Sequence, residues 1–303
     1  MGLSSTELEK SFGSLFDQIP ILSKRSELRE LSGGITNRNI AVTVAENKYV
    51  ARISSNESSL LSIDRKAEFA NSKIAAANMV GAPVHAYYPE HGLLVIGFLE
   101  GRTFTAQDVA ANLPRIAESC RQLHSSDPFV RDFDMFTVQK SYLSIVQERG
   151  FKIPVDYLNY EKYVQQLHAA FNSTPVPIVP CNNDLLPANF IDDGNKIWLI
   201  DYEYSGNNDA CFELGNIWSE AKLNYPELVE LVDAYFGSHR PERIARAWLF
   251  SVLAKYGWTL WASIQDGISE IDFDFWSWGL EKYEESQRLF TSTQFQREIA
   301  ALL

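Results

Sequence analysis

The sequence predicts an α+β protein in two parts, a small antiparallel sheet followed by a larger, mainly helical region. Between residues 27 and 53 hydrophobic residues recur with a period of two, whereas from about residue 105 onward their spacing is mostly helical. The change falls at "LEGRT", residues 99–103. We therefore expect an N-terminal domain over residues 1–99 and a C-terminal domain over residues 100–303.

The N-terminal part is expected to contain two helices and five strands. A serine cap followed by hydrophobic residues at helical spacing predicts a helix over 4–16. A second helix over 63–79 ends at Gly81, with a proline just beyond it. Alternating segments predict strands at 27–31, 39–44 and 48–53, and a further pair within 84–99 around a turn at 89–92.

The C-terminal part is expected to be helical with one exception. A strand, a turn and a second strand are predicted over 178–201, with the turn at "DDGN". The helices are predicted at 105–124, 139–149, 159–172, 211–222, 226–236, 240–267 and 271–290.

Composition excludes several classes of partner. The formal net charge of −12 argues against binding to nucleic acid or anionic lipid, because phosphate groups require clustered Lys and Arg. The longest apolar run, "GLLVIGFL", is far too short to span a bilayer, and no signal-peptide pattern opens the chain. The three cysteines show no metal-ligand spacing, which is typical of free thiols in a reducing cytoplasm. We expect a cytoplasmic protein, and the oligomeric state, monomer or homodimer, stays open.

The segment "CNNDLLPANFIDDGNKIWLIDYEYSG", residues 181–206, carries the strongest chemical pattern. Asp184 and Asn189 form D-x-x-x-x-N, and Asp201 follows at the end of an apolar strand. Phosphoryl transfer from ATP requires a base for the substrate hydroxyl and oxygen ligands that hold magnesium against the phosphates. A hairpin would return Asp201 to Asn189 as the two Mg²⁺ ligands, with Asp184 as the base. The alternative is that these residues are only loop caps.

The turn "LSGGITNRNI" between the first two strands is a candidate phosphate loop. Gly33 and Gly34 allow backbone amides to approach phosphate oxygens, and Ser32, Thr36 and Asn37 can add side-chain donors. No Gly-Lys-Ser/Thr follows, so the turn is not a Walker loop, and Gly-Gly also forms ordinary hairpin turns. Its place before the second strand favours the nucleotide-binding interpretation.

Arg52 and Glu68 form a second candidate element for nucleotide binding. Arg52 falls in the middle of the third strand, and Glu68 lies on the helix that follows. A cation on the third strand paired with a helix carboxylate is how kinases hold the α- and β-phosphates of ATP. The alternative is an exposed Arg at a sheet edge and a solvated Glu on a helix.

Four tryptophans, Trp258, Trp261, Trp276 and Trp278, lie within 21 residues near the C-terminus. Trp258 and Trp261 are three residues apart on a predicted helix and share a face. Helical tryptophans commonly belong to the core, but indole faces are also the best partners for quaternary ammonium ions. Glu220, on an earlier predicted helix, is the candidate acidic partner for such a cation.

Taken together, these segments resemble the choline/ethanolamine kinase family, whose fold is shared with aminoglycoside phosphotransferases and protein kinases. Three motifs carry the resemblance in the order of the family: "GGITN", "CNNDLLPANF" and "IDYEYSGNNDACFELGN". The later segment "GWTLWASIQDGISEIDFDFWSW" is similar to the helix pair that lines the choline pocket in that family. The resemblance implies a two-lobed, protein-kinase-like fold with a small sheet lobe and a mainly helical lobe.

The resemblance also implies an activity and roles for individual residues. It implies an ATP- and Mg²⁺-dependent kinase acting on the hydroxyl of choline or a related amino-alcohol, with Asp184 as base and Asn189 and Asp201 as metal ligands. It further implies that Arg52, partnered by Glu68, contacts the ATP phosphates. The segment Gly97, Phe98 and Leu99 would offer backbone groups to adenine, and the ammonium-binding positions correspond to Tyr204, Glu220, Trp258, Trp261 and Trp278.

One residue departs from the family pattern. The His of the catalytic loop is replaced by Asn182, which can donate and accept hydrogen bonds over a shorter reach. We expect activity to survive this replacement. The alternatives are a kinase of the same fold for an aminoglycoside, methylthioribose or ethanolamine, a pseudokinase that binds without transfer, and a purely structural helical protein.

Overall fold

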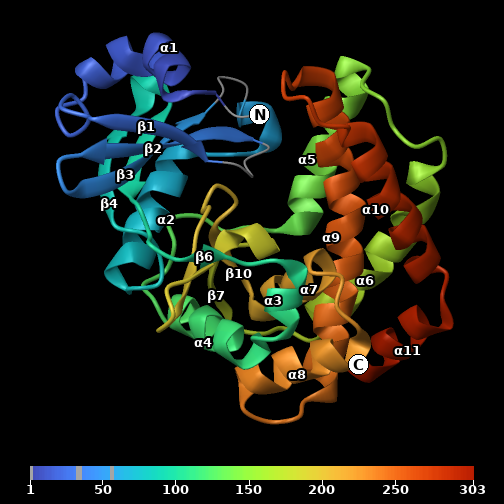
Figure 1. The fold of residues 1–303 in the computed structure, drawn as a ribbon. Coiled ribbons are helices and arrows are strands. Elements are labelled where there is room, and N and C mark those ends of the chain that lie inside the picture. Colours follow the sequence, from blue (N-terminus) through green and yellow to red (C-terminus); the bar gives the residue numbers. More distant parts are fainter. Residues whose placement is uncertain (1–2, 32–35, 55–57) are drawn as a thin grey trace.

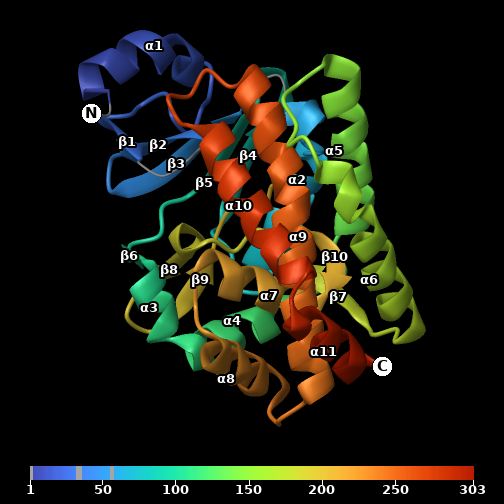
Figure 2. The ribbon, with the colours of Figure 1, turned by 90° about the vertical axis from the view of Figure 1, so that its right-hand side faces the viewer.

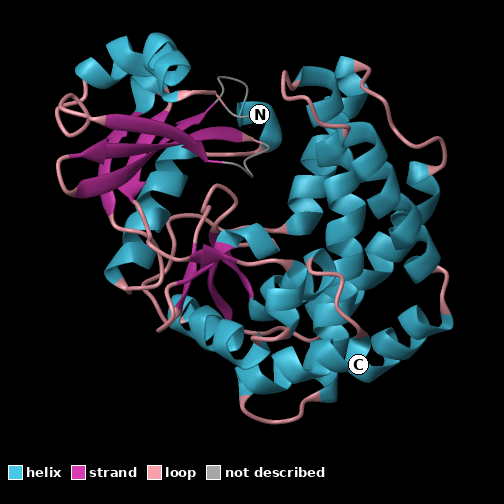
Figure 3. Ribbon diagram, in the orientation of Figure 1, coloured by secondary structure: helices cyan, strands magenta, loops and turns pink. Residues whose placement is uncertain are grey.

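The computed structural model describes residues 3–31, 36–54 and 58–303, which form two lobes (Figure 1). The smaller lobe contains an antiparallel sheet, and the larger lobe is mostly helical (Figure 3). The sheet has the order β1-β2-β3-β5-β4. Its strands are β1 (Glu27–Leu31), β2 (Asn37–Val44), β3 (Asn47–Ser54), β4 (Val84–Tyr88) and β5 (Leu93–Gly97), all at the positions predicted from the sequence.

Helix α1 (Ser5–Asp17) covers one face of this sheet (Figure 1). It begins after Ser4, whose side chain forms a capping box with Glu7. Its apolar stripe buries Leu8 and Phe16 against the inward-facing side chains of the strands. This cluster is the core of the smaller lobe, and the strand residues in it are Leu28, Ile40, Val42, Ala51, Leu93 and Val95.

Helix α2 (Arg65–Ala77) links the two lobes. It begins after Asp64, whose carboxylate accepts hydrogen bonds from the first amides of the helix. Asn71 Nδ2 donates to Ser205 Oγ at 3.0 Å, and Asn71 Oδ1 accepts from the Val130 amide at 3.0 Å. The helix that carries Glu68 is therefore fastened to the larger lobe by a buried side chain.

The chain passes between the lobes directly after β5. The Gly97 amide donates to the Pro83 carbonyl at 2.7 Å, and the Phe98 amide donates to the Lys48 carbonyl at 3.1 Å. The short strand β6 (Arg102–Thr103) already pairs with the larger lobe, through β8. The division into domains at residues 99 and 100 stays a prediction.

The larger lobe is organised around α9 (Pro241–Ile268), which runs through its centre (Figures 1 and 2). Proline at the first helical position suits the helix start, and the helix is buried on all sides from Ile244 to Gln265 because neighbours surround it. Its neighbours include α5 (Met135–Arg149), α6 (Glu161–Ser173), α7 (Ala210–Glu220), α8 (Tyr225–Phe236), α10 (Phe275–Phe290) and α11 (Thr293–Leu302).

One glycine fixes how closely α7 approaches α9. A Cβ atom at Gly215 would lie 2.1 Å from the Ala247 carbonyl oxygen, a distance that no side chain tolerates. The contact sets the position of α7, which carries Glu213 and Glu220.

The remaining strands of the larger lobe lie close to the passage between the lobes. β7 (Ile178–Cys181) pairs with β10 (Gly206–Asp209), and β8 (Phe190–Asp192) pairs with β9 (Ile197–Leu199). The β8–β9 turn contains Gly194 at φ 90°, and the Asp193 side chain accepts hydrogen bonds from the amides of Asn195 and Lys196.

The structure corrects several predicted elements. The strand, turn and strand expected over 178–201 are confirmed around "DDGN", where β8 and β9 pair across the turn. The expectation was wrong for residues 178–181, which form a separate strand, β7, that pairs with β10 instead. The helix expected over 105–124 is two helices, α3 (Ala106–Ala110) and α4 (Leu113–His124), which separate ahead of Pro114.

Two helices begin at residues other than those predicted, because an aspartate caps each of them. Helix α5 begins at Met135 rather than 139 because the Asp134 carboxylate accepts from the amides of the first turn, and Asp274 likewise begins α10 at Phe275 rather than 271. Helix α11, which begins after the cap Ser292, was not predicted. Of the helices described, none combines the length and apolar character needed to span a membrane.

Candidate active site

Most of the predicted site residues line one cavity between the two lobes. The smaller lobe contributes Thr36 and Asn37, and the larger lobe contributes the rest of the wall. The lining residues of the larger lobe are Asp184, Leu186, Ala188, Asn189, Asp201, Glu203, Tyr204, Glu220, Trp258, Trp261 and Trp278. Residues from the catalytic, metal and ammonium sets of the sequence analysis therefore meet in a single space.

The loop that carries Asp184 is held by the residue before it. Asn183 adopts φ 69°, a left-handed conformation that asparagine tolerates better than most residues. Its Nδ2 group donates to the carbonyls of Cys181, Tyr204 and Gly206 at 3.1–3.2 Å. The side chain thus ties the loop to the segment that follows Asp201.

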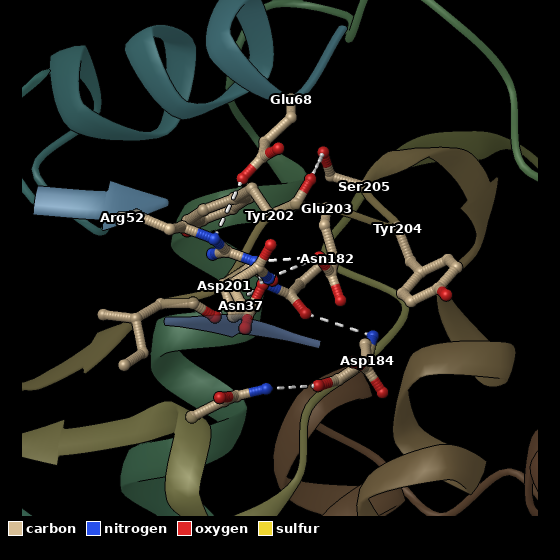
Figure 4. A network of polar contacts seen from close by, with 12 residues as sticks. Asn37, Arg52, Glu68, Asn182, Asp184, Asp201, Tyr202, Glu203, Tyr204 and Ser205 are labelled. Atoms are coloured by element: carbon tan, nitrogen blue, oxygen red, sulfur yellow. Dashed lines mark hydrogen bonds and ion pairs between the residues drawn. The ribbon is translucent and has the colours of Figure 1, made fainter. Parts of the chain in front are cut away.

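Asn182 connects the Asp184 loop to the Asp201 loop (Figure 4). Its Nδ2 group donates to the carbonyls of Ile200 at 3.1 Å and Asp201 at 3.0 Å, and its Oδ1 accepts from the Asp184 amide at 3.1 Å. Asn182 is fully buried. The asparagine in place of the family histidine therefore orders both loops through three hydrogen bonds.

A buried carboxylate on α7, Glu213, supports the same loop and was not predicted. Glu213 Oε1 accepts from the Asn182 amide at 3.2 Å, and Oε2 accepts from the Asn183 amide at 2.6 Å. His124 Nε2 lies 3.1 Å from Oε1. An acidic residue in the otherwise apolar run "ACFELGNIW" was the available signal, because a buried carboxylate requires partners.

The two candidate metal ligands lie beside each other as the hairpin prediction requires. The Ile200 amide donates to the Asn189 carbonyl at 3.0 Å, which aligns the chain before Asp201 with Asn189. Asn189 Nδ2 donates to the Asp184 carbonyl at 2.7 Å, and both Asn189 and Asp201 line the cavity. Asp201 adopts φ 65°, an uncommon conformation for aspartate that is typical of functional sites.

The donor set fits a divalent cation. Asp201 and Asn189 offer hard oxygen atoms, the type that Mg²⁺ prefers. Burial raises the pKa of Asp201 to about 6 even though Arg52 acts in the opposite direction. Burial, together with Asp201, Glu203 and Glu220, raises the pKa of Asp184 well above its ordinary value. This end of the cavity is therefore short of positive charge.

Arg52 is the centre of a buried ion-pair network that joins the lobes (Figure 4). Its Nε atom lies 3.3 Å from Glu68 Oε1, and its Nη2 atom lies 2.5 Å from Asp201 Oδ1 and 2.9 Å from Glu203 Oε2. Although burial opposes the charged form, Asp201, Glu68 and Glu203 raise the pKa of Arg52. The predicted pairing of Arg52 with Glu68 is confirmed.

Arg65 and Glu203 belong to this network and were not predicted. Arg65 Nη1 donates to Glu68 at 2.7 Å and to Glu203 at 3.1 Å. Asn37 Nδ2 donates to Glu203 at 2.8 Å, and Asn37 Oδ1 accepts from Arg65 at 3.0 Å. Glu203 stands two residues after Asp201, so alternation along "IDYEY" was the signal that could have found it.

The remaining nucleotide-binding predictions have different outcomes. Ser32, Gly33 and Gly34 lie outside the described residues, and Thr36 lines the cavity. In the segment between the lobes, the amides of Gly97 and Phe98 are engaged within the smaller lobe. The Leu99 amide donates to no group within the part of the chain that the structure describes.

The other end of the cavity is aromatic. Trp261 Nε1 donates to the Tyr204 hydroxyl at 2.7 Å, and the Tyr204 and Trp258 rings meet edge to face with centroids 5.1 Å apart. The Trp261 and Trp278 centroids lie 5.4 Å apart at 63°. Trp276 does not line the cavity and lies under Lys152 instead. Three indoles and a phenol therefore surround one end, a geometry suited to an organic cation.

Glu220 lines the same end, but it already has a cation partner within the chain. Lys282 Nζ on α10 donates to Glu220 Oε1 at 2.6 Å, and both side chains are about nine-tenths buried. Neither the lysine nor the pairing was predicted. Lys282 stands four residues after Trp278 on one helix face, which was the signal available in the sequence.

Comparison with known proteins agrees with this geometry. The profile of the family described as "Choline/ethanolamine kinase" matches residues 28–231. Ethanolamine kinase 1 of Mus musculus is 26% identical, with 85% of this chain and 82% of the relative covered.

Two solved structures share the fold. A choline/ethanolamine kinase family protein from Mesorhizobium loti superposes with a TM-score of 0.85 at 27% identity, covering 97% of this chain and 99% of the other. The choline kinase LicA from Streptococcus pneumoniae gives 0.78 at 22% identity, covering 94% and 99%. The two-lobed, protein-kinase-like fold is confirmed, and the chain belongs to the choline/ethanolamine kinase family.

Proposed function

We propose that this protein transfers the γ-phosphoryl group of ATP to the hydroxyl of choline or a closely related amino-alcohol. The observation that carries the proposal is the single cavity, which has a base and oxygen ligands at one end and three indoles with a carboxylate at the other. An amino-alcohol has a hydroxyl and an ammonium group a few bonds apart, so it can reach both ends at once. Family membership supports ATP as the co-substrate.

Asp184 is the proposed base. It lines the cavity, and Asn182 and Asn183 hold its loop, so its carboxylate can orient the substrate hydroxyl and accept its proton. A raised pKa makes Asp184 a stronger proton acceptor once it is ionised, and bound cations favour that ionised form.

Asn189 and Asp201 are the proposed ligands for Mg²⁺, which when bound neutralises charge on the phosphates. Arg52 is proposed to face the phosphates as well. Its Nη1 atom donates no hydrogen bond to the described residues, whereas its Nε and Nη2 atoms face carboxylates. The Leu99 amide is the proposed contact for adenine.

The three cysteines are free and buried, which supports the proposal of a cytoplasmic location.

Release of ADP, measured with choline, ethanolamine and an aminoglycoside as alternative acceptors, tests the proposal. We expect Mg²⁺-dependent turnover with at least one amino-alcohol and none with the aminoglycoside. Turnover with the aminoglycoside alone would overturn the assignment of substrate. Turnover that does not require a divalent cation would overturn the assignment of Asn189 and Asp201 as metal ligands.

A further inference from the structure

Glu220 lines the aromatic end of the cavity, and Lys282 pairs with it through a buried hydrogen bond. Lys282 Nζ also lies 4.2 Å from the centroid of the Trp278 ring, which is a cation–π contact. One of the three indoles that could hold a substrate cation is therefore already engaged by a cation of the protein, and so is the only carboxylate that we assign to that role.

The surroundings of Lys282 fix its choice of partner. Lys255, on α9 and one turn before Trp258, lies nearby and pairs with Glu285 at 2.8 Å. Because Glu285 compensates Lys255, Lys282 is left to compensate Glu220. Each lysine thus has its own carboxylate, and the Glu220–Lys282 pair carries no net charge.

We infer that Lys282 is a specificity-determining residue that makes this site prefer a quaternary ammonium substrate over a primary one. The inference rests on the proposed function and deepens it. Lys282 acts through Glu220: it donates a hydrogen bond to the Oε1 atom and neutralises the negative charge of that carboxylate. Lys282 itself is not expected to touch the reacting atoms.

The physical reason lies in the hydration of the two kinds of substrate. A primary ammonium is a compact, strongly hydrated charge with three N–H donors, so its transfer into an aromatic pocket requires acceptors and a compensating negative charge. A trimethylammonium group has no N–H donor and spreads its charge over methyl groups, and indole faces suit it well. A carboxylate already neutralised by lysine therefore penalises the primary ammonium more than the quaternary one.

Steady-state kinetics with choline and ethanolamine test the inference in the full-length enzyme. In Lys282→Met the freed carboxylate can accept a charge-assisted hydrogen bond from ethanolamine, so the ratio of kcat/KM for choline to that for ethanolamine should fall by about 10- to 100-fold. The fall should arise mainly from a lower KM for ethanolamine. Lys282→Arg should keep the wild-type ratio, because the positive charge is retained.

Two further variants separate specificity from stability. Lys222→Met removes the exposed Lys222–Glu281 pair, which lies beside the same helix α10, and should leave the ratio unchanged. The double variant Glu220→Gln, Lys282→Met removes both charges without leaving an unpaired buried carboxylate, and should keep a preference for choline. It also gives a second measurement if Lys282→Met folds poorly.

The outcomes distinguish the inference from the proposed function. A wild-type enzyme that prefers ethanolamine, or an unchanged ratio in Lys282→Met, would overturn the inference while leaving an amino-alcohol kinase in place. An equal loss of kcat/KM for both substrates in Lys282→Met would show that the lysine is only structural, which also overturns it. Absence of turnover with either amino-alcohol in the wild type would overturn the proposed function itself.

Discussion

The two ends of the cavity are built in different ways. The phosphate end is assembled from both lobes, because Arg52 on β3 and Glu68 on α2 meet Asp201 and Glu203 from the larger lobe. The aromatic end belongs to the larger lobe alone, where Trp258 and Trp261 project from α9 and pack with residues of α10 and of the Asp201 loop.

Substitutions at the two ends of the cavity are therefore expected to have different consequences. At the phosphate end, Arg52 joins the lobes by pairing with Asp201 and Glu203, and both of these carboxylates also line the cavity. A change there is therefore expected to affect stability and chemistry together. The aromatic rings are fixed by the surrounding core. A change to one ring at the aromatic end is therefore expected to affect substrate binding more than the arrangement of the lobes.

The largest effect is expected from the base. Asp184→Ala should lower kcat by about 10²- to 10⁴-fold, because the other carboxylates that line the cavity, Asp201, Glu203 and Glu220, are each paired with an Arg or Lys of the chain. Binding of nucleotide, measured by titration calorimetry, should change little, because Asp184 is assigned to the substrate hydroxyl. The exposed Asp127→Ala is the control and should retain full turnover. Near-normal turnover of Asp184→Ala would contradict its role as base.

Arg52→Met tests whether the phosphate end holds the lobes together. Removal of one partner from a buried ion-pair network should lower the free energy of unfolding in urea by about 3–5 kcal/mol. Lys48 lies on the same strand and forms an exposed pair with Glu100, so Lys48→Met should cost less than about 1 kcal/mol. Equal losses in the two variants would remove the distinction between buried and exposed pairs on β3.

Asn182→Ala tests the link between the Asp184 loop and the Asp201 loop. It leaves two carbonyls without their donor, at a cost of about 1–3 kcal/mol in the free energy of unfolding. Because both loops lose their alignment, kcat should fall as well, by up to about 100-fold. Asn182→His restores the family residue and should keep most of the activity. An Asn182→Ala enzyme with normal kcat would show that the loops are ordered by other contacts.

Trp278→Ala tests the aromatic end and should give the smallest effect. Loss of one of the three indoles that line the aromatic end should raise the KM for choline by about 5- to 30-fold, with kcat nearly unchanged. Trp276, two residues earlier on α10 and outside the cavity wall, provides the matched control, and Trp276→Ala should not alter the KM. A similar change in both variants would indicate an effect on α10 as a whole.

Local pattern was sufficient to predict most elements and the positions of the main site residues. The period-two segments matched the five strands of the smaller lobe, and D-x-x-x-x-N with the later Asp201 identified residues that line the cavity. The errors concern the strand β7 and several helix caps, whereas the pairing of β8 with β9 matches the predicted turn. Strand β7 pairs with β10, which follows Asp201 in the chain. Nothing in the sequence between these two strands indicates that they pair.

The sequence by itself determined the order of the motifs, the fold class and the identity of the aromatic residues, together with Asp184, Asp201 and Glu220, in the site. Only the tertiary structure decided which charges face one another. Arg65, Glu203, Glu213 and Lys282 gave no strong local signal, because a buried charge is specified by a partner that is distant along the chain. Periodicity reports the burial of apolar side chains, whereas compensation of a buried charge depends on geometry that folding alone creates.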